Sequence, residues 1–118
     1  MERYHIFSDV TMETILDSLE AILDEEANPE YEVEYNSGVL TLKLGVHGTY
    51  VINKQPPNKQ IWLSSPVSGP KRYDYDAQED NWVYSRDKRP IGDLLNVEVS
   101  KALGREIDLG VGKVADLL

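Results

Sequence analysis

The chain has 118 residues, of which 41% are hydrophobic and 28% are charged, with a formal net charge of −9 and no cysteine. This length and composition predict one ordinary globular domain, and the lack of cysteine excludes disulfides, thiolate metal sites and cysteine nucleophiles. No apolar run approaches the ~20 residues of a membrane-spanning helix, so we expect no membrane association.

Residues 8–26 have the apolar periodicity of an amphipathic helix. At 100° per residue their apolar side chains fall within an arc of roughly 120°, the width of a stripe that faces a core. Asn28-Pro29 ends the helix, because the residue before a proline avoids the helical region. The start has two alternatives, Ser8 as an N-cap or a start near Tyr4. The apolar stripe comprises Met12, Ile15, Leu16, Leu19, Ile22 and Leu23.

From residue 30 onward the apolar residues recur with a period of two, which predicts β-strands. Asn36-Ser37-Gly38 makes a turn, and Pro56-Pro57 stiffens a later loop. The six predicted strands cover residues 31–35, 40–44, 49–55, 60–64, 71–75 and 82–85.

A second helix is predicted between Pro90 and Gly104, with Pro90 suited to the first helical position. We expect residues 1–104 to form one domain, and the tail, residues 105–118, to pack on it as an irregular cover. The order helix, antiparallel meander, helix predicts an α+β two-layer sandwich with both helices on one sheet face and the other face in water. The tail holds Ile107, Leu109, Val111 and Leu117 among glycines and acids.

Charge is unevenly distributed along the chain. Residues 1–34 contain eleven acids against Arg3 alone, a balance of −10, whereas residues 35–75 have a balance of +4. The acidic end suits cations or a basic partner, and we expect no nucleic acid as the main ligand.

Five acids of the first helix, the acidic row, fall within about 80° of one another beside the apolar stripe. A solvated helix face is the general interpretation, but like charges four residues apart cost roughly 0.2–0.5 kcal/mol per pair. Glu20 and Asp24 also lie toward the helix C-terminus, where the helix dipole disfavours anions. A concentrated set of oxygen ligands is one gain that could offset this cost. The acidic row is Asp9, Glu13, Asp17, Glu20 and Asp24, and Glu30, Glu32 and Glu34 could extend it.

Carboxylates without cysteine bind hard, hydrated cations through oxygen and water. We expect such a site to be weak, and its ligands alone do not choose between iron, manganese, calcium and magnesium. His5 joins the acidic row if the first helix starts early, whereas His47 lies in a turn and is expected to be inert.

The third to fifth strands carry polar residues on the face that should meet water. Ile61 and Leu63 take the core side of the fourth strand, so the period of two places Gln60 and Trp62 on the other side. Core burial is the alternative for Trp62, but Trp82 already supplies a core aromatic. An exposed tryptophan beside arginine and amides has the composition of a protein-binding hot spot.

No enzyme motif is present: the chain has no phosphate loop, nucleophile elbow, zinc-ligand spacing or dinucleotide fingerprint. From the residues alone, two hypotheses therefore remain open: a weak cation site on the acidic row, and a protein-binding module whose acids attract a basic partner.

With these residues in hand, the chain resembles the frataxin family, of the eukaryotic mitochondrial kind. The resemblance runs from about residue 4 to residue 104, and its most specific part is the long segment GTYVINKQPPNKQIWLSSPVSGPKRYDY (Gly48 to Tyr75). The other matching segments are YH (Tyr4-His5), LDSL (Leu16 to Leu19), SGVLTLKLG (Ser37 to Gly45), NWVYSR (Asn81 to Arg86) and DLL (Asp93 to Leu95).

The resemblance implies a monomeric protein of the mitochondrial matrix that promotes iron–sulfur cluster assembly by docking on cysteine desulfurase and its scaffold protein. It also implies iron (Fe²⁺/Fe³⁺) held weakly by carboxylates, with ferroxidase activity and storage in iron-induced oligomers as alternatives. The implied metal residues, the acidic ridge, are the acidic row with Glu30, Glu32, Glu34 and His5. The implied docking face is Asn53, Gln55, Asn58, Lys59, Gln60, Trp62 and Arg72.

The chain departs from the family pattern at several positions. Many relatives have a second acid where Val10 stands, and often an acid in place of Ala21, so the ridge is thinner here. Pro90 stands where relatives often have a serine cap, which predicts a different start of the second helix.

Overall fold

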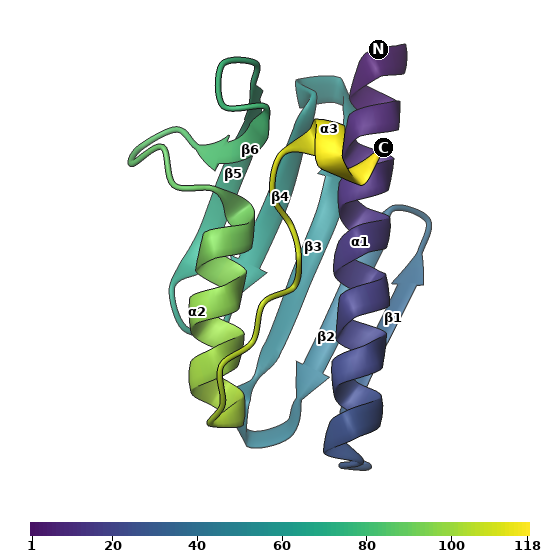
Figure 1. Cartoon of the computed structure of the whole chain (residues 1–118), viewed down its shortest axis with the longest axis vertical. Coiled ribbons are helices and arrows are strands. Elements are labelled where there is room, and N and C mark those ends of the chain that lie inside the picture. Colours follow the sequence, from purple (N-terminus) through teal and green to yellow (C-terminus); the bar gives the residue numbers. More distant parts are fainter.

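The computed structural model, which describes residues 1–118, consists of a sheet layer and a helix layer (Figure 1). The sheet is an antiparallel meander of six strands in sequence order, and the helices cover one of its faces. This confirms the predicted α+β sandwich. The strands are β1 (Tyr31–Asn36), β2 (Val39–Leu44), β3 (Thr49–Gln55), β4 (Gln60–Ser65), β5 (Gly69–Asp76) and β6 (Asn81–Tyr84); the helices are α1 (Glu2–Glu26), α2 (Ile91–Leu103) and α3 (Val114–Leu117).

Helix α1 begins at Glu2, before either predicted start. Ser8 is buried inside the helix and donates to the carbonyl of His5 at 3.3 Å, so the N-cap prediction was wrong. The first turn is held by Tyr4, whose hydroxyl donates to the carbonyl of Gln60 (2.7 Å) and accepts from the amide of Gln55 (3.0 Å). Because these partners lie on the sheet, local sequence gave no signal for the early start.

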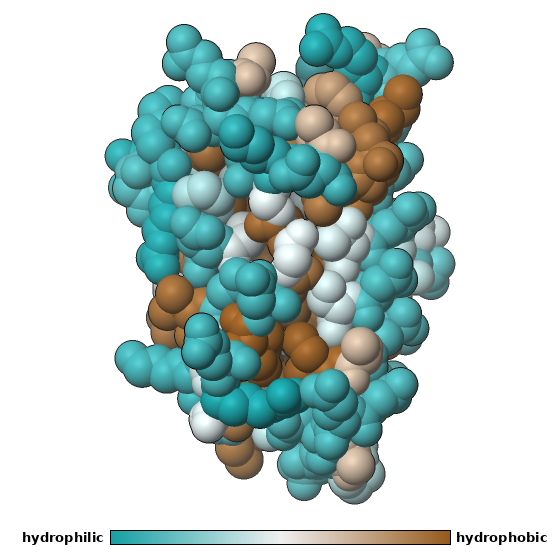
Figure 2. Space-filling view, in the orientation of Figure 1, coloured by the Kyte–Doolittle hydropathy of each residue, from teal (hydrophilic) through white to brown (hydrophobic).

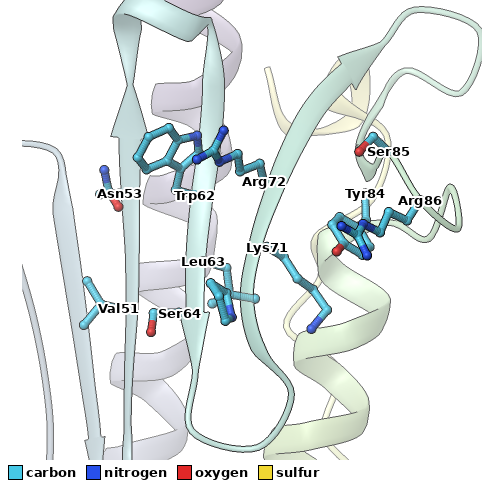
Figure 3. A pocket seen from close by; sticks show the side chains of 11 residues that line it. Val51, Asn53, Trp62, Leu63, Ser64, Lys71, Arg72, Tyr84, Ser85 and Arg86 are labelled. Carbon is cyan, nitrogen blue, oxygen red and sulfur yellow. The ribbon is translucent and has the colours of Figure 1, made fainter.

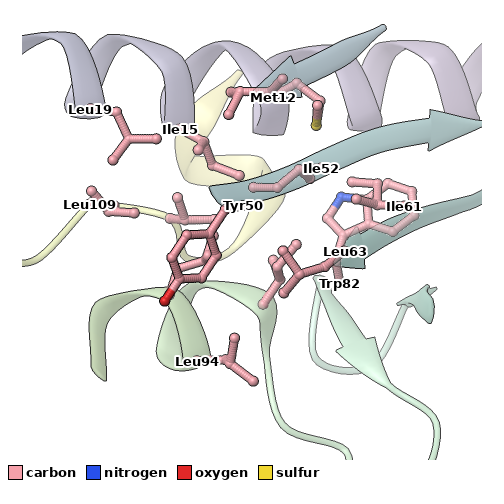
Figure 4. Packing of buried hydrophobic residues seen from close by; sticks show 14 of the residues in the cluster. Met12, Ile15, Leu19, Tyr50, Ile52, Ile61, Leu63, Trp82, Leu94 and Leu109 are labelled. Atoms are coloured by element: carbon pink, nitrogen blue, oxygen red, sulfur yellow. The ribbon is translucent and has the colours of Figure 1, made fainter. Parts of the chain in front are cut away.

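The apolar stripe of α1 packs on the inner face of the sheet (Figure 4). Met12, Ile15 and Leu19 are buried, whereas the remaining residues of the stripe are half-buried at its border. Burying the three side chains stabilises the fold by roughly 1.5–3 kcal/mol each. Their partners from the sheet include Leu40, Leu42, Leu44, Tyr50, Ile52, Ile61, Leu63, Tyr73 and Trp82.

The period of two is confirmed in the strands. In β2 and β4 the leucine and isoleucine positions are buried and the alternate positions are not. The third strand, β3, has the predicted bounds. Strands β5 and β6 begin earlier than predicted, because the ladder continues through the pairs Ser65–Gly69 and Asp76–Asn81.

Helix α2 begins at Ile91, and Pro90 precedes it with an extended backbone, so the placement of Pro90 as the first helical residue was wrong.

The tail runs along the strip between α1 and α2 (Figure 1), where apolar and small residues separate the polar outer sides of the two helices (Figure 2). Ser18 of α1 donates to the carbonyl of Leu109 at 2.6 Å, and Asn96 of α2 accepts from its amide at 2.8 Å.

The end of the tail differs from the expectation. Residues 114–117 form the short helix α3 rather than irregular structure, and its Val114 is fully buried. Asp80 holds this helix: its carbonyl accepts from the amide of Val114 and its carboxylate from the amide of Ala115, both at 2.8 Å. None of the helices combines the length and apolarity that a membrane crossing requires.

Candidate functional site

The acidic row lies along the side of α1 that neighbours the edge strand β1. Glu13, Asp17, Glu20 and Asp24 are exposed, and α1 packs against β1. Burial, together with the negative charges of Asp9 and Glu13, raises the pKa of Tyr35 in β1. The row therefore faces water along one edge of the sandwich.

Lys54 neutralises the N-terminal end of this row. Its ammonium donates to Asp9 Oδ1 at 2.6 Å and contacts His5 Nδ1 at 3.0 Å, and its side chain is only 12% exposed. His5 and Asp9 thus share a lysine, and a metal ion at Asp9 must compete with that ammonium. Sequence reasoning missed this contact, although the period of two places Lys54 on the core side of β3, beside Ile52.

The two acids within β1, Glu32 and Glu34, do not continue the acidic row. Tyr31, Val33 and Tyr35 pack toward the helices, so Glu32 and Glu34 point to the opposite face. There Glu32 lies opposite Lys43 and Glu34 opposite Thr41 on β2. Nowhere in the chain do three acid or histidine groups approach closely enough to hold a metal ion. The ridge offers separate surface carboxylates rather than a preformed cage.

Trp62 lies on the outer face of the sheet, as predicted. It stands directly opposite Asn53 of β3 and Arg72 of β5, and side chains opposite each other in antiparallel strands share a face. The half-buried indole donates to Gln60 Oε1 at 2.7 Å, and the Arg72 guanidinium lies 4.6 Å from the ring centroid. Gln60 in turn donates to Asp74 at 3.0 Å. The tryptophan is fixed in one orientation while part of it meets solvent.

The other predicted docking residues surround this row. Gln55 lies opposite Gln60 in the ladder, and its Oε1 accepts from the side-chain Nδ2 of Asn53 at 3.4 Å. Asn58 and Lys59 are exposed at the turn between β3 and β4, where Lys59 has a φ of 52°. The fold therefore brings five residues of the predicted docking face onto one end of the outer sheet face, namely Asn53, Gln55, Gln60, Trp62 and Arg72. Asn58 and Lys59 lie at the adjoining turn, beside Arg3 and Tyr4 at the start of α1.

A hollow of about 560 Å³ continues from Trp62 and Arg72 toward the end of β6 (Figure 3). Lys71, Tyr84 and Arg86 also line it, and the Lys71 ammonium lies 5.8 Å from the centroid of the Tyr84 ring. Lys71 lies opposite the buried Leu63 and Tyr84 opposite the buried Tyr73, so both side chains lie on the helix side of the sheet, and the hollow turns around the edge of β5 that β6 leaves unpaired. Sequence reasoning missed Lys71, Tyr84 and Arg86, because Tyr84 and Arg86 reach the hollow only through the pairing of β6 with β5.

The family model of the "Frataxin-like domain" matches residues 1–105 of the chain. The chain belongs to the frataxin family. A frataxin homolog named mitochondrial from Schizosaccharomyces pombe is 47% identical over 105 residues, which cover 89% of this chain and 66% of that protein. "Frataxin, mitochondrial" from Dictyostelium discoideum is 50% identical over 97 residues, 82% of this chain and 50% of that protein. The chain thus spans half to two thirds of the length of these frataxins.

The fold is also that of solved frataxins. A trimeric frataxin from Saccharomyces cerevisiae, described as complexed with ferrous, superposes with a TM-score of 0.72 at 48% identity, covering 84% of this chain and 87% of that one.

Proposed function

We propose that the chain is an accessory protein of the mitochondrial matrix that promotes iron–sulfur cluster assembly by docking on the complex of cysteine desulfurase and scaffold protein. The observation that carries this proposal is the fixed, half-exposed Trp62 in a row with Asn53 and Arg72. Tryptophan and arginine are the residues most enriched among binding hot spots.

The geometry of Trp62 favours binding for an entropic reason. Its indole N–H is bonded to Gln60 and its ring is stacked with Arg72 before any partner arrives. Ordering a rotamer-rich side chain at an interface costs about 0.5–1.5 kcal/mol. That cost is largely absent here, so burying the indole contributes more fully to affinity.

The test compares the two tryptophans. Trp62→Ala should change folding stability by no more than about 1 kcal/mol, yet weaken binding to the desulfurase–scaffold complex by about 2 kcal/mol or more. Trp82 is the control, because it is 1% exposed and donates to Thr11 Oγ1 at 3.0 Å. Trp82→Ala should cost roughly 3–5 kcal/mol of folding stability. Chemical denaturation and stimulation of desulfurase activity measure both effects, and equal unfolding of the two variants would contradict the proposal.

Iron is the proposed cargo of the acidic ridge, bound weakly through its carboxylates. Asp17, Glu20 and Asp24 support this part because they are exposed and form no ion pair. Amide NMR with Fe²⁺ added without oxygen tests it. Line broadening confined to residues 9–34 is expected, and diffuse or absent broadening would remove iron from this surface.

The alternative, a ferroxidase that stores iron in oligomers, is favoured by one observation, the trimeric yeast frataxin described as complexed with ferrous. Aerobic oxidation of Fe²⁺ by the wild type and by the double variant Asp17→Ala/Glu20→Ala separates the two functions. Equal rates, no faster than free iron, would exclude the ferroxidase. Sedimentation with and without Fe²⁺ tests whether the chain, proposed to be a monomer, forms oligomers with iron.

A further inference from the structure

The hollow beside Trp62 has a charge opposite to that of the protein. Three of its eleven lining residues, Lys71, Arg72 and Arg86, are cations and none is an acid, although the chain has 21 acids against 12 lysines and arginines. The hollow and the acidic row lie at different parts of the sheet. The acidic row is at the β1 edge, whereas the hollow is at β4, β5 and the residues that follow β6. We call this hollow, with Lys71, Arg72 and Arg86, the cationic hollow.

None of these cations has an anionic partner within the chain. The three ion pairs of the structure join Lys54 to Asp9 and Arg105 to two acids at the end of α1. Lys71 donates only to the carbonyl of Ser68, at 2.9 Å. Arg72 stacks on Trp62, which leaves the edge of its guanidinium free for a bidentate carboxylate. Unpaired cations around one hollow repel each other, and an anion would relieve that repulsion.

The rest of the lining suits a peptide. Val51 and Pro70 provide apolar surface, and Ser64 and Ser85 provide hydroxyls that can bond a peptide backbone. A long polyanion such as a nucleic acid, or an anionic membrane, would extend past the hollow and meet the acids elsewhere on the surface. A short acidic segment fits within the hollow and avoids them.

We propose that the cationic hollow receives an acidic peptide segment of the protein partner, whose carboxylates pair with Arg72 on the outer sheet face and with Lys71 and Arg86 where the hollow turns around the unpaired edge of β5. The inference rests on the proposed docking function and extends the docking face past Arg72. It also sets an orientation, because the partner then presents acidic residues to the hollow and has its basic residues near the β1 edge.

Arg86→Glu is the direct test, and Lys101→Glu is its matched control. Both side chains are exposed, both form no ion pair, and both substitutions change the net charge equally, but Lys101 lies on α2 outside the hollow. Affinity for the desulfurase–scaffold complex should fall about tenfold in Arg86→Glu and become less dependent on salt, whereas Lys101→Glu should stay within about twofold of wild type.

Amide NMR with synthetic hexaglutamate locates the site. Shifts should appear at residues 71, 72 and 84–86, and should vanish in Arg86→Glu but persist in Lys101→Glu. Two results would overturn the proposal: equal effects of the two substitutions on affinity, or the same shifts with phosphatidylserine vesicles and none with hexaglutamate. Stimulation of the desulfurase by wild type and its loss in Trp62→Ala report separately on the proposed function, so the inference can fail while that function stands.

Discussion

Lys54 of β3 and Asp9 of α1 form an ion pair of 2.6 Å across the two layers of the sandwich. The lysine is nearly buried, with its side chain 12% exposed, and the aspartate is 49% exposed. The pair therefore holds α1 to the sheet and also occupies one carboxylate of the proposed iron site.

Replacing Lys54 by methionine should separate these two roles. Methionine keeps an apolar stem of similar length, so the main loss is the charge partner of Asp9, which we expect to cost about 1 kcal/mol because Asp9 is half exposed. Fe²⁺ should then bind more tightly at the N-terminal end of the ridge. Urea denaturation and an anaerobic Fe²⁺ titration measure the two effects, and unchanged iron affinity would show that Asp9 is not a ligand.

Glu20 and Asp24 should destabilise the fold. Both are exposed, unpaired and near the C-terminal end of α1, which has no basic residue in its last turn. The double variant Glu20→Gln/Asp24→Asn should raise the melting temperature, by relief of about 0.3–1 kcal/mol, and weaken iron binding. A lower melting temperature would mean that these side chains make stabilising contacts.

The neighbouring acids provide the control for that variant. Glu25 and Glu26 accept from Arg105 at 2.9 Å each, so Glu25→Gln/Glu26→Gln removes attraction as well as repulsion. This variant should not raise the melting temperature, although it removes the same number of charges from the same helix end. Thermal unfolding at low and high salt distinguishes the two double variants. Because salt screens repulsion, the gain in melting temperature of Glu20→Gln/Asp24→Asn should shrink at high salt.

Gly92 should tolerate no side chain. It lies in α2, where alanine would ordinarily favour the helix by about 1 kcal/mol, but a Cβ there would lie 2.3 Å from the carbonyl oxygen of Val111. Gly92→Ala should therefore destabilise the fold by roughly 1–3 kcal/mol through displacement of the tail. Gly112→Ala is the control, since no atom lies within 4 Å of its Cβ. Equal stability of the two variants in urea would contradict this packing.

Tyr75 should make stability fall at alkaline pH. A hydrogen bond to Asp80, then burial, raises its pKa to about 12. A pKa raised in the folded state gives stability that is complete below the unfolded value of about 10 and is lost as pH rises through the folded value. In Tyr75→Phe, the unfolding free energy should fall less between about pH 10 and 12 than it does in the wild type. The difference in unfolding free energy between wild type and variant separates the contribution of Tyr75 from that of the other tyrosines. A difference that does not change with pH would contradict the link between Tyr75 ionisation and folding.

The hydrogen bond that raises the pKa of Tyr75 lowers the pKa of its acceptor, Asp80. Donation from Tyr75, and then from the amide of Ala115, lowers the pKa of Asp80. A lowered pKa gives stability that is present above the unfolded value and is lost as pH falls through the folded one. Asp80→Asn should therefore reduce the loss of stability on acidification, measured by urea unfolding from neutral pH downward, and should loosen α3. An identical acid dependence in the variant would contradict this assignment.

The sequence by itself determined the layers and the outward tryptophan. An apolar period of 3.6 in the first helix and of two in the strands assigns each side chain to a face, because backbone geometry repeats at those intervals. The same count separates Trp62 from Trp82: Trp62 alternates with two buried aliphatic residues in β4, and it lies on the outer face.

Only the tertiary structure decided which residues meet across those layers. The early start of α1 depends on Tyr4 reaching Gln55 and Gln60, and the masking of Asp9 depends on Lys54, 45 residues away along the chain. The strand acids were read as part of one ridge, yet the pleat sends Glu32 and Glu34 to the outer face. Such contacts follow from strand register and helix placement, which are set by packing of the whole core and have no local signal in the sequence.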